Sequence, residues 1–478
     1  MRKRTFLLLY IFLFCLQLSL PVWAIGTEQT SPTSYIVQLK SPLPTPLSLS
    51  DEKTFYQEIS AAHGLYVIED YEIVELLQEE GLVRYAEPDY EVELFTEDSL
   101  APFTASVTSA SWPLDMLGTA YGNTLGCFGQ GIRVGIIDSG AYAHDDLSAN
   151  LLPGYNFLSD TTDVTDNIGH GTFVAGLIAA MDNGWGVTGV APAAQILPLK
   201  CFDTGATTKV SMICRAIYAA VDEYDCQILN MSFGVKSYSE TFAKAIQYAA
   251  DQGVIAVASA GNEGTAQLYY PAAFPSVIGV GAVNDQKTVA YFSQRNDSVL
   301  ITAPGQAVYS TSNAGDYTLK SGTSFSAPMV VGLLARMLNA DPTLTPQAAA
   351  QVLTTTAIDL GDEGYDTAYG YGLVSLPEIF SHLLFDTPYF LAPLSKTAGT
   401  LSVSFFNNTA EPFFGQCFFS EYKKGLMIAF DWQDLYLQPG DAATIFYPAT
   451  QNETKCYLWH DLSNITVITP YQDSEGSS

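Results

Sequence analysis

The sequence predicts an α/β protein in which a parallel sheet carries helices on both faces, preceded by a smaller α/β unit and followed by a β-sandwich. Three observations support this fold class. Between about 112 and 385, apolar runs of strand length alternate with helical patterns, which is typical of a buried parallel sheet. Residues 33–94 alternate strand-like and helical segments on a smaller scale. From 386 onward, short segments of alternating polarity follow one another.

The N-terminus has the residue order of a cleaved secretory signal. Three basic residues at positions 2–4 precede an apolar run from Phe6 to Leu20, and the small residue Ala24 follows. The run is short for a membrane span, so a retained anchor is the weaker alternative. We therefore expect residues 1–24 to be removed. The mature protein is then secreted and extracellular, and no membrane span remains after signal removal.

Residues 25–96 form the second predicted unit. Strands are expected at 34–40 and 65–69, helices at 51–62 and 71–80, and an extended run with Glu87-Pro88-Asp89 ends the unit. This alternation predicts a small α/β sandwich, which either leaves on maturation or stays as a binding domain. Residues 97–111 are rich in Ser, Thr and Ala and lack periodicity, which predicts an exposed linker that contains the maturation site.

The third predicted unit, residues 112–385, contains the parallel sheet. Asp138 and Asn262 each come just after an apolar strand, at the edge of the sheet where α/β proteins bind ligands. The expected strands are 132–137, 195–199, 228–231, 254–258, 277–280 and 299–302, and the expected helices are 210–223, 241–251, 325–338 and 346–355.

Residues 386–478 predict a β-sandwich, because short strand-like segments alternate with Asn, Gly, Pro and Asp. Aromatic residues of such a domain could stack on sugars, although packing in its core is the favoured interpretation. These aromatics are Phe413, Phe414, Trp432 and Trp459.

Charge and cysteine content restrict the partners. The net charge of −30 repels phosphate backbones and anionic membranes, so no nucleic acid partner is expected. We expect a monomer. Six cysteines follow the signal, and their spacing leaves disulfide pairing open, with Cys417 and Cys456 as one possible pair.

Three short motifs carry the chemistry of the middle unit: D-S-G-A at Asp138, G-H-G-T-F-V-A-G at His170 and S-G-T-S-F-S-A-P at Ser324. Amide hydrolysis requires a nucleophile, a base and a group that orients the base. His170 opens a helical segment of small residues, whereas His144 lies in a turn-like context and His382 at the edge of the domain. Ser324 begins a helix, whose unpaired N–H groups favour an oxyanion.

In this order, the motifs resemble those of the subtilisin-like serine peptidases. The resemblance implies that Asp138 orients His170, that His170 acts as general acid and base, and that Ser324 is the nucleophile. Asn262, in S-A-G-N-E-G, is implied as the oxyanion donor. Residues 25–96 resemble the inhibitory propeptide of this family.

The same resemblance implies a substrate cleft. The stretch Ser232-Phe233-Gly234 corresponds to the edge strand that pairs with extended substrate, and Ser259-Ala260-Gly261 corresponds to the opposite wall of the specificity pocket. Tyr269 stands where the family often has glycine, before Tyr270-Pro271 with its expected cis bond. An inward ring would make the pocket shallow and favour small side chains, and an outward ring would have no such effect.

A calcium site is the last implication of the resemblance. The loop M-D-N-G-W-G-V-T-G-V-A-P is similar to one that wraps the ion in calcium-binding members, and oxygen ligands suit this hard cation. The implied ligands are the side chains of Asp146 and Asn183 and the carbonyls of Met181, Trp185 and Val187.

The sequence thus predicts a secreted serine endopeptidase that works through an acyl-enzyme and is made as a precursor inhibited by its own propeptide. Proteins or peptides are its expected substrates. The alternative is a catalytically silent protein of the same fold that binds peptides, carbohydrate or a cell surface.

Overall fold

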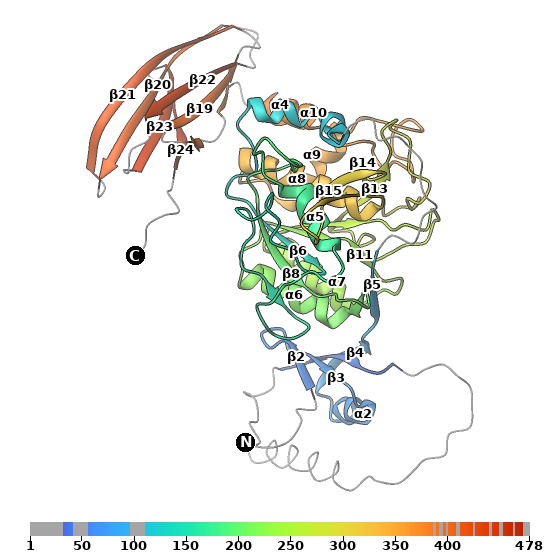
Figure 1. The fold of residues 1–478 in the computed structure, drawn as a ribbon. Helices are drawn as coiled ribbons and strands as arrows, with labels where there is room; N and C mark the ends of the chain where they lie inside the picture. The colour runs from blue at the N-terminus through green and yellow to red at the C-terminus, as the bar shows by residue number, and fades with distance from the viewer. Residues whose placement is uncertain are drawn as a thin grey trace. The chain divides into compact units, whose positions relative to one another are not determined.

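The computed structural model in Figure 1 describes residues 32–41, 56–95 and 110–385, together with the strands between 389 and 471. The predicted signal, residues 1–24, lies outside these ranges, as do residues 97–109 of the predicted linker. Within the described ranges, no helix is both long and apolar enough to cross a bilayer.

The N-terminal unit is an antiparallel sheet of order β2-β3-β1-β4 with one described helix, α2. The helix expected at 51–62 is wrong in its described part, because β2 pairs with β3 there and sheet pairing overrides the local pattern. The side chain of Asp70 caps α2 by accepting the N–H of Glu72. The elements are β1 (Tyr35–Leu39), β2 (Tyr56–Ser60), β3 (Leu65–Ile68), α2 (Tyr71–Glu79) and β4 (Val83–Pro88).

The middle unit is built on a parallel sheet of seven strands in the order β14-β13-β12-β10-β6-β8-β7, as predicted. All six pairs of neighbouring strands are parallel. The strands are β6 (Arg133–Asp138), β7 (Tyr155–Asn156), β8 (Gln195–Lys200), β10 (Ile228–Met231), β12 (Ile255–Ser259), β13 (Val277–Val283) and β14 (Ile301–Pro304).

Helices cover both faces of this sheet (Figure 1) and create two cores. On one face, α5 (His170–Ala179) and α8 (Thr323–Ala340) cover the side chains at alternate positions along the strands, such as Val134 and Ile136 of β6. On the other, α6 (Val210–Asp222) and α7 (Glu240–Asp251) cover the intervening positions, such as Ile137. Further helices are α3 (Trp112–Leu117), α4 (Thr119–Thr124), α9 (Pro346–Thr356) and α10 (Leu376–Phe385).

The C-terminal unit is the predicted β-sandwich. The ring of Phe419 in one sheet stacks on Tyr447 of the other, with ring centroids 4.6 Å apart, so the two sheets face each other. One sheet contains β17 (Tyr389–Leu391), β18 (Ser395–Thr397), β19 (Thr400–Asn407) and β22 (Ala442–Pro448). The other contains β20 (Phe413–Lys423), β21 (Leu426–Leu437), β23 (Glu453–Asp461) and β24 (Asn464–Tyr471).

Cysteine pairing is settled for the middle unit. Its four cysteines are buried free thiols, which pack as small apolar residues. In the C-terminal unit, Cys456 lies opposite Phe419 and Cys417 lies opposite Leu458, so the two cysteines are not direct cross-strand neighbours. The four thiols are Cys127, Cys201, Cys214 and Cys226.

Candidate active site

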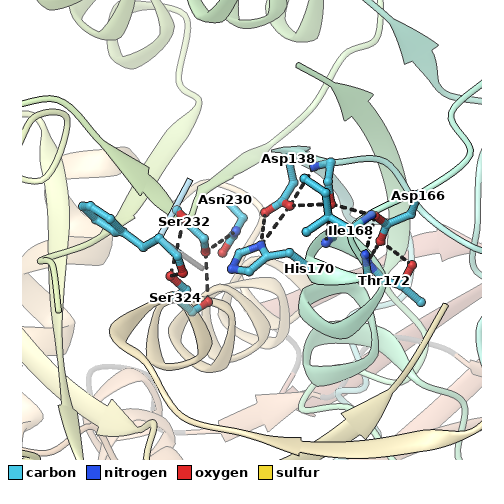
Figure 2. A network of polar contacts seen from close by, with 12 residues as sticks. Asp138, Asp166, Ile168, His170, Thr172, Asn230, Ser232 and Ser324 are labelled. Atoms are coloured by element: carbon cyan, nitrogen blue, oxygen red, sulfur yellow. Dashed lines mark hydrogen bonds and ion pairs between the residues drawn. The ribbon is translucent and has the colours of Figure 1, made fainter. Parts of the chain in front are cut away.

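The candidate site lies at the carboxyl edge of three neighbouring strands, β6, β10 and β12. Asp138 is the last residue of β6 and His170 is the first residue of α5. The imidazole Nδ1 of His170 lies 2.9 Å from both carboxylate oxygens of Asp138, and both side chains are buried (Figure 2). The carboxylate can only accept, so it fixes the proton on Nδ1 and leaves Nε2 with a lone pair.

Ser324, the second residue of α8, lies on the other side of the imidazole in Figure 2. Its hydroxyl donates to the carbonyl oxygen of Phe95 at 3.1 Å, with the carbonyl of Ser232 at 3.4 Å. The Nε2 atom of His170 is buried and has no hydrogen-bond partner. A base with an unused lone pair and a hydroxyl nearby is the arrangement that proton transfer requires.

Asn262 follows β12 and is tied to the start of α8. Its Oδ1 accepts the N–H of Thr323 at 2.8 Å and the hydroxyl of Thr323 at 2.7 Å. These two donors fix the orientation of the amide, so its NH₂ group is directed elsewhere. A Cβ built on Gly322, which precedes α8, would lie 3.2 Å from that nitrogen. An amide N–H₂ beside a helix N-terminus can stabilise an oxyanion.

The cleft beside Ser324 contains a strand of the N-terminal unit, β5 (Glu91–Leu94). On one side β5 pairs antiparallel with β11, where Phe233 and Gly234 lie opposite Leu94 and Glu93. On the other it pairs antiparallel with β9 (Thr207–Lys209). The expected edge at Phe233-Gly234 therefore pairs with extended chain. The β9 edge was not predicted, because three polar residues carry no periodic signal.

The side chain of Phe95 lies beside Gly234 and Tyr269, two residues of the predicted specificity pocket. A Cβ built on Gly234 would meet its ring at 2.4 Å, so only glycine leaves that wall open. The ring of Tyr269 points inward and meets Phe95 edge to face, with centroids 5.0 Å apart at 87°. Gly261 supports Tyr269 from behind, since a Cβ there would lie 2.9 Å from its ring. The inward ring therefore leaves room for an aromatic side chain.

An ion pair holds Tyr269 in this position. The phenol of Tyr269 donates to Glu263 at 2.8 Å, and Lys236 lies 2.8 Å from the same carboxylate oxygen. Lys236, and then the phenol, lower the pKa of Glu263. Burial, reinforced by Glu263, raises the pKa of Tyr269 to about 12, so the phenol stays neutral. The Glu263 carboxylate is thus paired with Lys236 and lies behind the ring of Tyr269. The Tyr270–Pro271 bond is cis, as expected.

The remaining predicted pocket residues lie on or directly after β10 and β12. Ser232 follows β10, and its hydroxyl donates to the main-chain carbonyl of Ser324 at 2.9 Å. Ser259 ends β12 and is buried, and Ala260 links it to Gly261. The neighbouring Asn230, which was not predicted, donates to the hydroxyl of Ser232 at 3.0 Å.

Two carboxylates of the N-terminal unit cap helices of the middle unit. Glu87 accepts from Ser239 and from the main-chain N–H groups of Glu240 and Thr241, at the start of α7. Asp89 accepts from the N–H and hydroxyl of Ser211, in the first turn of α6. Burial raises the pKa of Asp89. Negative groups at helix N-termini are stabilising, so these contacts bind the two units together.

The predicted calcium ligands do not form an open oxygen cage. Asp146 accepts hydrogen bonds on both oxygens, from the Asn183 amide at 2.8 Å, the Val187 N–H at 3.0 Å and the Tyr317 hydroxyl at 2.7 Å. The other end of the Asn183 amide accepts the N–H of Trp185. Met181 donates its N–H to the Asp146 carbonyl. As they lie, the side chains of Asp146 and Asn183 are satisfied by hydrogen-bond donors rather than by a cation, so calcium binding by this loop stays a prediction.

The aromatic residues singled out in the C-terminal unit are only partly described. Phe414 and Trp432 have exposed side chains on the sheet that contains β20 and β21, contrary to the core packing favoured from sequence. The side chains of Phe413 and Trp459 lie outside the described part of the chain. Sugar binding by this unit stays a prediction.

Comparison with known proteins decides the family. The profile of the subtilase family matches residues 129–372, a span that holds all three motifs. The chain belongs to the subtilase family. The predicted resemblance to subtilisin-like serine peptidases is therefore confirmed.

Relatives in the family differ in the length they share with this chain. Minor extracellular protease Epr of Bacillus subtilis is 32% identical over 73% of this chain, which spans about half (54%) of Epr. Thermostable alkaline protease of Halalkalibacterium halodurans is 32% identical over 69% of this chain and 92% of its own length. The structure of fervidolysin from Fervidobacterium pennivorans matches with a TM-score of 0.64 at 24% identity, over 91% of this chain and 72% of fervidolysin, which shows a common fold.

Proposed function

We propose that this subtilase is a secreted serine endopeptidase made as a precursor that its own N-terminal unit inhibits. The observation that carries the proposal is the pose of Phe95. Its carbonyl lies against the Ser324 hydroxyl, while β5, which leads into it, is paired on both edges. An extended chain held by main-chain bonds with a carbonyl at the nucleophile is the pose of a peptide substrate. Secretion is supported by the signal-like pattern of residues 1–24.

The side chains of the site can perform acyl transfer. Ser324 turns its hydroxyl to His170 Nε2, gives up the proton and attacks the carbonyl carbon of the substrate. The Asn262 amide and the Ser324 N–H at the start of α8 stabilise the oxyanion. His170 then protonates the leaving amine, and water hydrolyses the ester with His170 again as base. Asp138 keeps the imidazole in its tautomer and stabilises the imidazolium.

From the position of the Phe95 carbonyl we also infer which bond is cut on maturation. The peptide bond that follows the Phe95 carbonyl joins Phe95 to Thr96, so maturation there would release a chain that begins at Thr96. Such a cut would lie just ahead of the 97–111 segment, where the sequence suggested it. The caps at Glu87 and Asp89 would keep the severed unit bound as an inhibitor.

The decisive experiment expresses the full chain with and without Ser324→Ala and determines the new N-terminus. We expect the unmodified chain to begin at Thr96 and the variant to stay joined across Phe95–Thr96 and to cleave no peptide. A variant that matures normally would show that another protease makes the cut. Absence of peptide cleavage by the unmodified chain would support the silent binding protein instead.

A further inference from the structure

A second buried carboxylate lies behind the Asp138–His170 pair. Asp166, in the loop before α5, is 4% exposed and accepts five hydrogen bonds. Four come from the entrance of α5: the N–H groups of Ile168, Gly169 and Thr172, and the Thr172 hydroxyl. Gly169, the residue before α5, has φ 81° and no side chain to cap the helix, so Asp166 supplies the cap.

The fifth bond reaches the other half of the triad. The hydroxyl of Ser139, the residue after Asp138, donates to Asp166 at 2.8 Å and lies 3.2 Å from Asp138. A hydroxyl has one proton, and the shorter contact directs it to Asp166. The Ser139 oxygen in turn accepts the N–H of Gly171, next to His170. One carboxylate and one hydroxyl thus join the end of β6 to the first turn of α5.

The main chain on both sides of this link is also fixed. Buried Lys200 donates to the Ser139 carbonyl at 2.7 Å, and Asn313 donates to the Asp166 carbonyl at 2.9 Å. Neither Ser139 nor Asp166 can therefore move without breaking buried polar contacts, which is costly.

We propose that Asp166 is a positioning residue of the triad. It acts through Ser139 and the start of α5 to hold the side chains of Asp138 and His170 in their relative positions. The inference rests on the proposed function, since it concerns the same site. A cap alone would stabilise α5, whereas the link to Ser139 sets the Asp138–His170 geometry. Small misplacements of catalytic groups reduce rates far more than they reduce stability.

The test uses two variants that break the link differently. Ser139→Ala removes the hydroxyl and leaves the α5 cap in place, so it remains informative if Asp166→Asn does not fold. We expect each to slow cleavage of a peptide substrate by about 10-fold to 100-fold in kcat with KM nearly unchanged. Ser139→Thr, which keeps the hydroxyl, should restore the rate. Asp163→Asn is the matched control, because Asp163 is exposed on the same loop and its carboxylate accepts from Thr165, not from the start of α5 or from Ser139.

The second readout is independent of activity. In the Ser324→Ala precursor, the proton resonance of His170 Nδ1–H should move upfield in Ser139→Ala and stay in place in Asp163→Asn. The proposal is overturned if Ser139→Ala keeps the wild-type kcat or the wild-type position of the His170 Nδ1–H resonance. It is also overturned if only the melting temperature changes. If the unmodified chain cleaves nothing, the proposed function fails and the resonance alone decides this inference.

Discussion

At the scale of single residues, the specificity pocket departs most from what the sequence suggested. Tyr269 points inward, yet its ring and that of Phe95 meet edge to face, so an aromatic ring fits beside it. The sequence could place Tyr269 in the pocket but could not give its ring orientation. That orientation depends on Glu263 and Lys236, whose ion pair forms only after folding.

We expect peptides with Phe before the scissile bond to be cleaved faster than those with Ala. Burying a Phe side chain contributes about 1.5 to 3 kcal/mol, roughly 10-fold to 150-fold in kcat/KM. Tyr269→Gly should lose about 2-fold to 10-fold of this preference with the edge-to-face contact. Tyr269→Phe, which keeps the ring, is the control. Fastest turnover of Ala peptides would contradict this expectation and support a shallow pocket that favours small side chains.

The three residues proposed as the triad could be selected from the sequence because each lies in its own short motif at a strand or helix end. Asp166 and Ser139 could not, because they lie 27 residues apart and each alone is an ordinary loop residue. Their relation exists only once β6 and α5 are packed together. The sequence also could not show that the Tyr317 hydroxyl donates to Asp146, because the two residues lie 171 positions apart. Without that contact, the family resemblance alone assigned Asp146 and Asn183 to calcium.

At the scale of elements, the strands of the parallel sheet were predicted well, because buried parallel strands are continuous apolar runs. Of the two short edge strands, β9 was not predicted, and β11 was expected only from the family resemblance. They have three and two residues and exist as strands only through their pairing with β5. The predicted helix at 51–62 fails for a related reason, since β2 is defined by its pairing with β3.

The junction of Glu87 with α7 gives a prediction at this scale. Glu87→Gln removes the charge that four donors and the helix N-terminus share, a loss of about 1.5 to 3 kcal/mol. After maturation, the severed N-terminal unit should therefore leave roughly 10-fold to 100-fold faster, measured as recovery of peptidase activity on dilution. Glu91→Gln, at an exposed position of β5, should recover at the wild-type rate.

At the scale of the whole molecule, hydrogen bonds link distant segments in the place where the sequence suggested an ion. Asp146 joins the loop at 183–187 to the hairpin of β15 (Val308–Thr311) and β16 (Tyr317–Lys320). Gly186 allows this approach, because a Cβ there would lie 2.0 Å from the Tyr317 hydroxyl. The fold therefore contains its own bridge between these segments.

Chelation tests this bridge. In the Ser324→Ala protein, which cannot digest itself, we expect EGTA to change the melting temperature by less than about 2 °C. An ion at 100 times its Kd would contribute about 2.7 kcal/mol, so a fall of roughly 5 °C or more would show that calcium holds the loop. Tyr317→Phe should lower the melting temperature with and without EGTA, because it removes a donor to a buried carboxylate.

The pairing of β5 between β9 and β11 has a consequence for the choice of substrate. Most of its bonds are between main chains, which any sequence can supply, but they require a run of chain drawn out flat and accessible on both edges. A helix or a strand inside a folded sheet cannot offer that run. The choice between substrates would then depend less on their amino-acid sequence than on their conformation. Locally unfolded proteins would be digested in preference to compact ones.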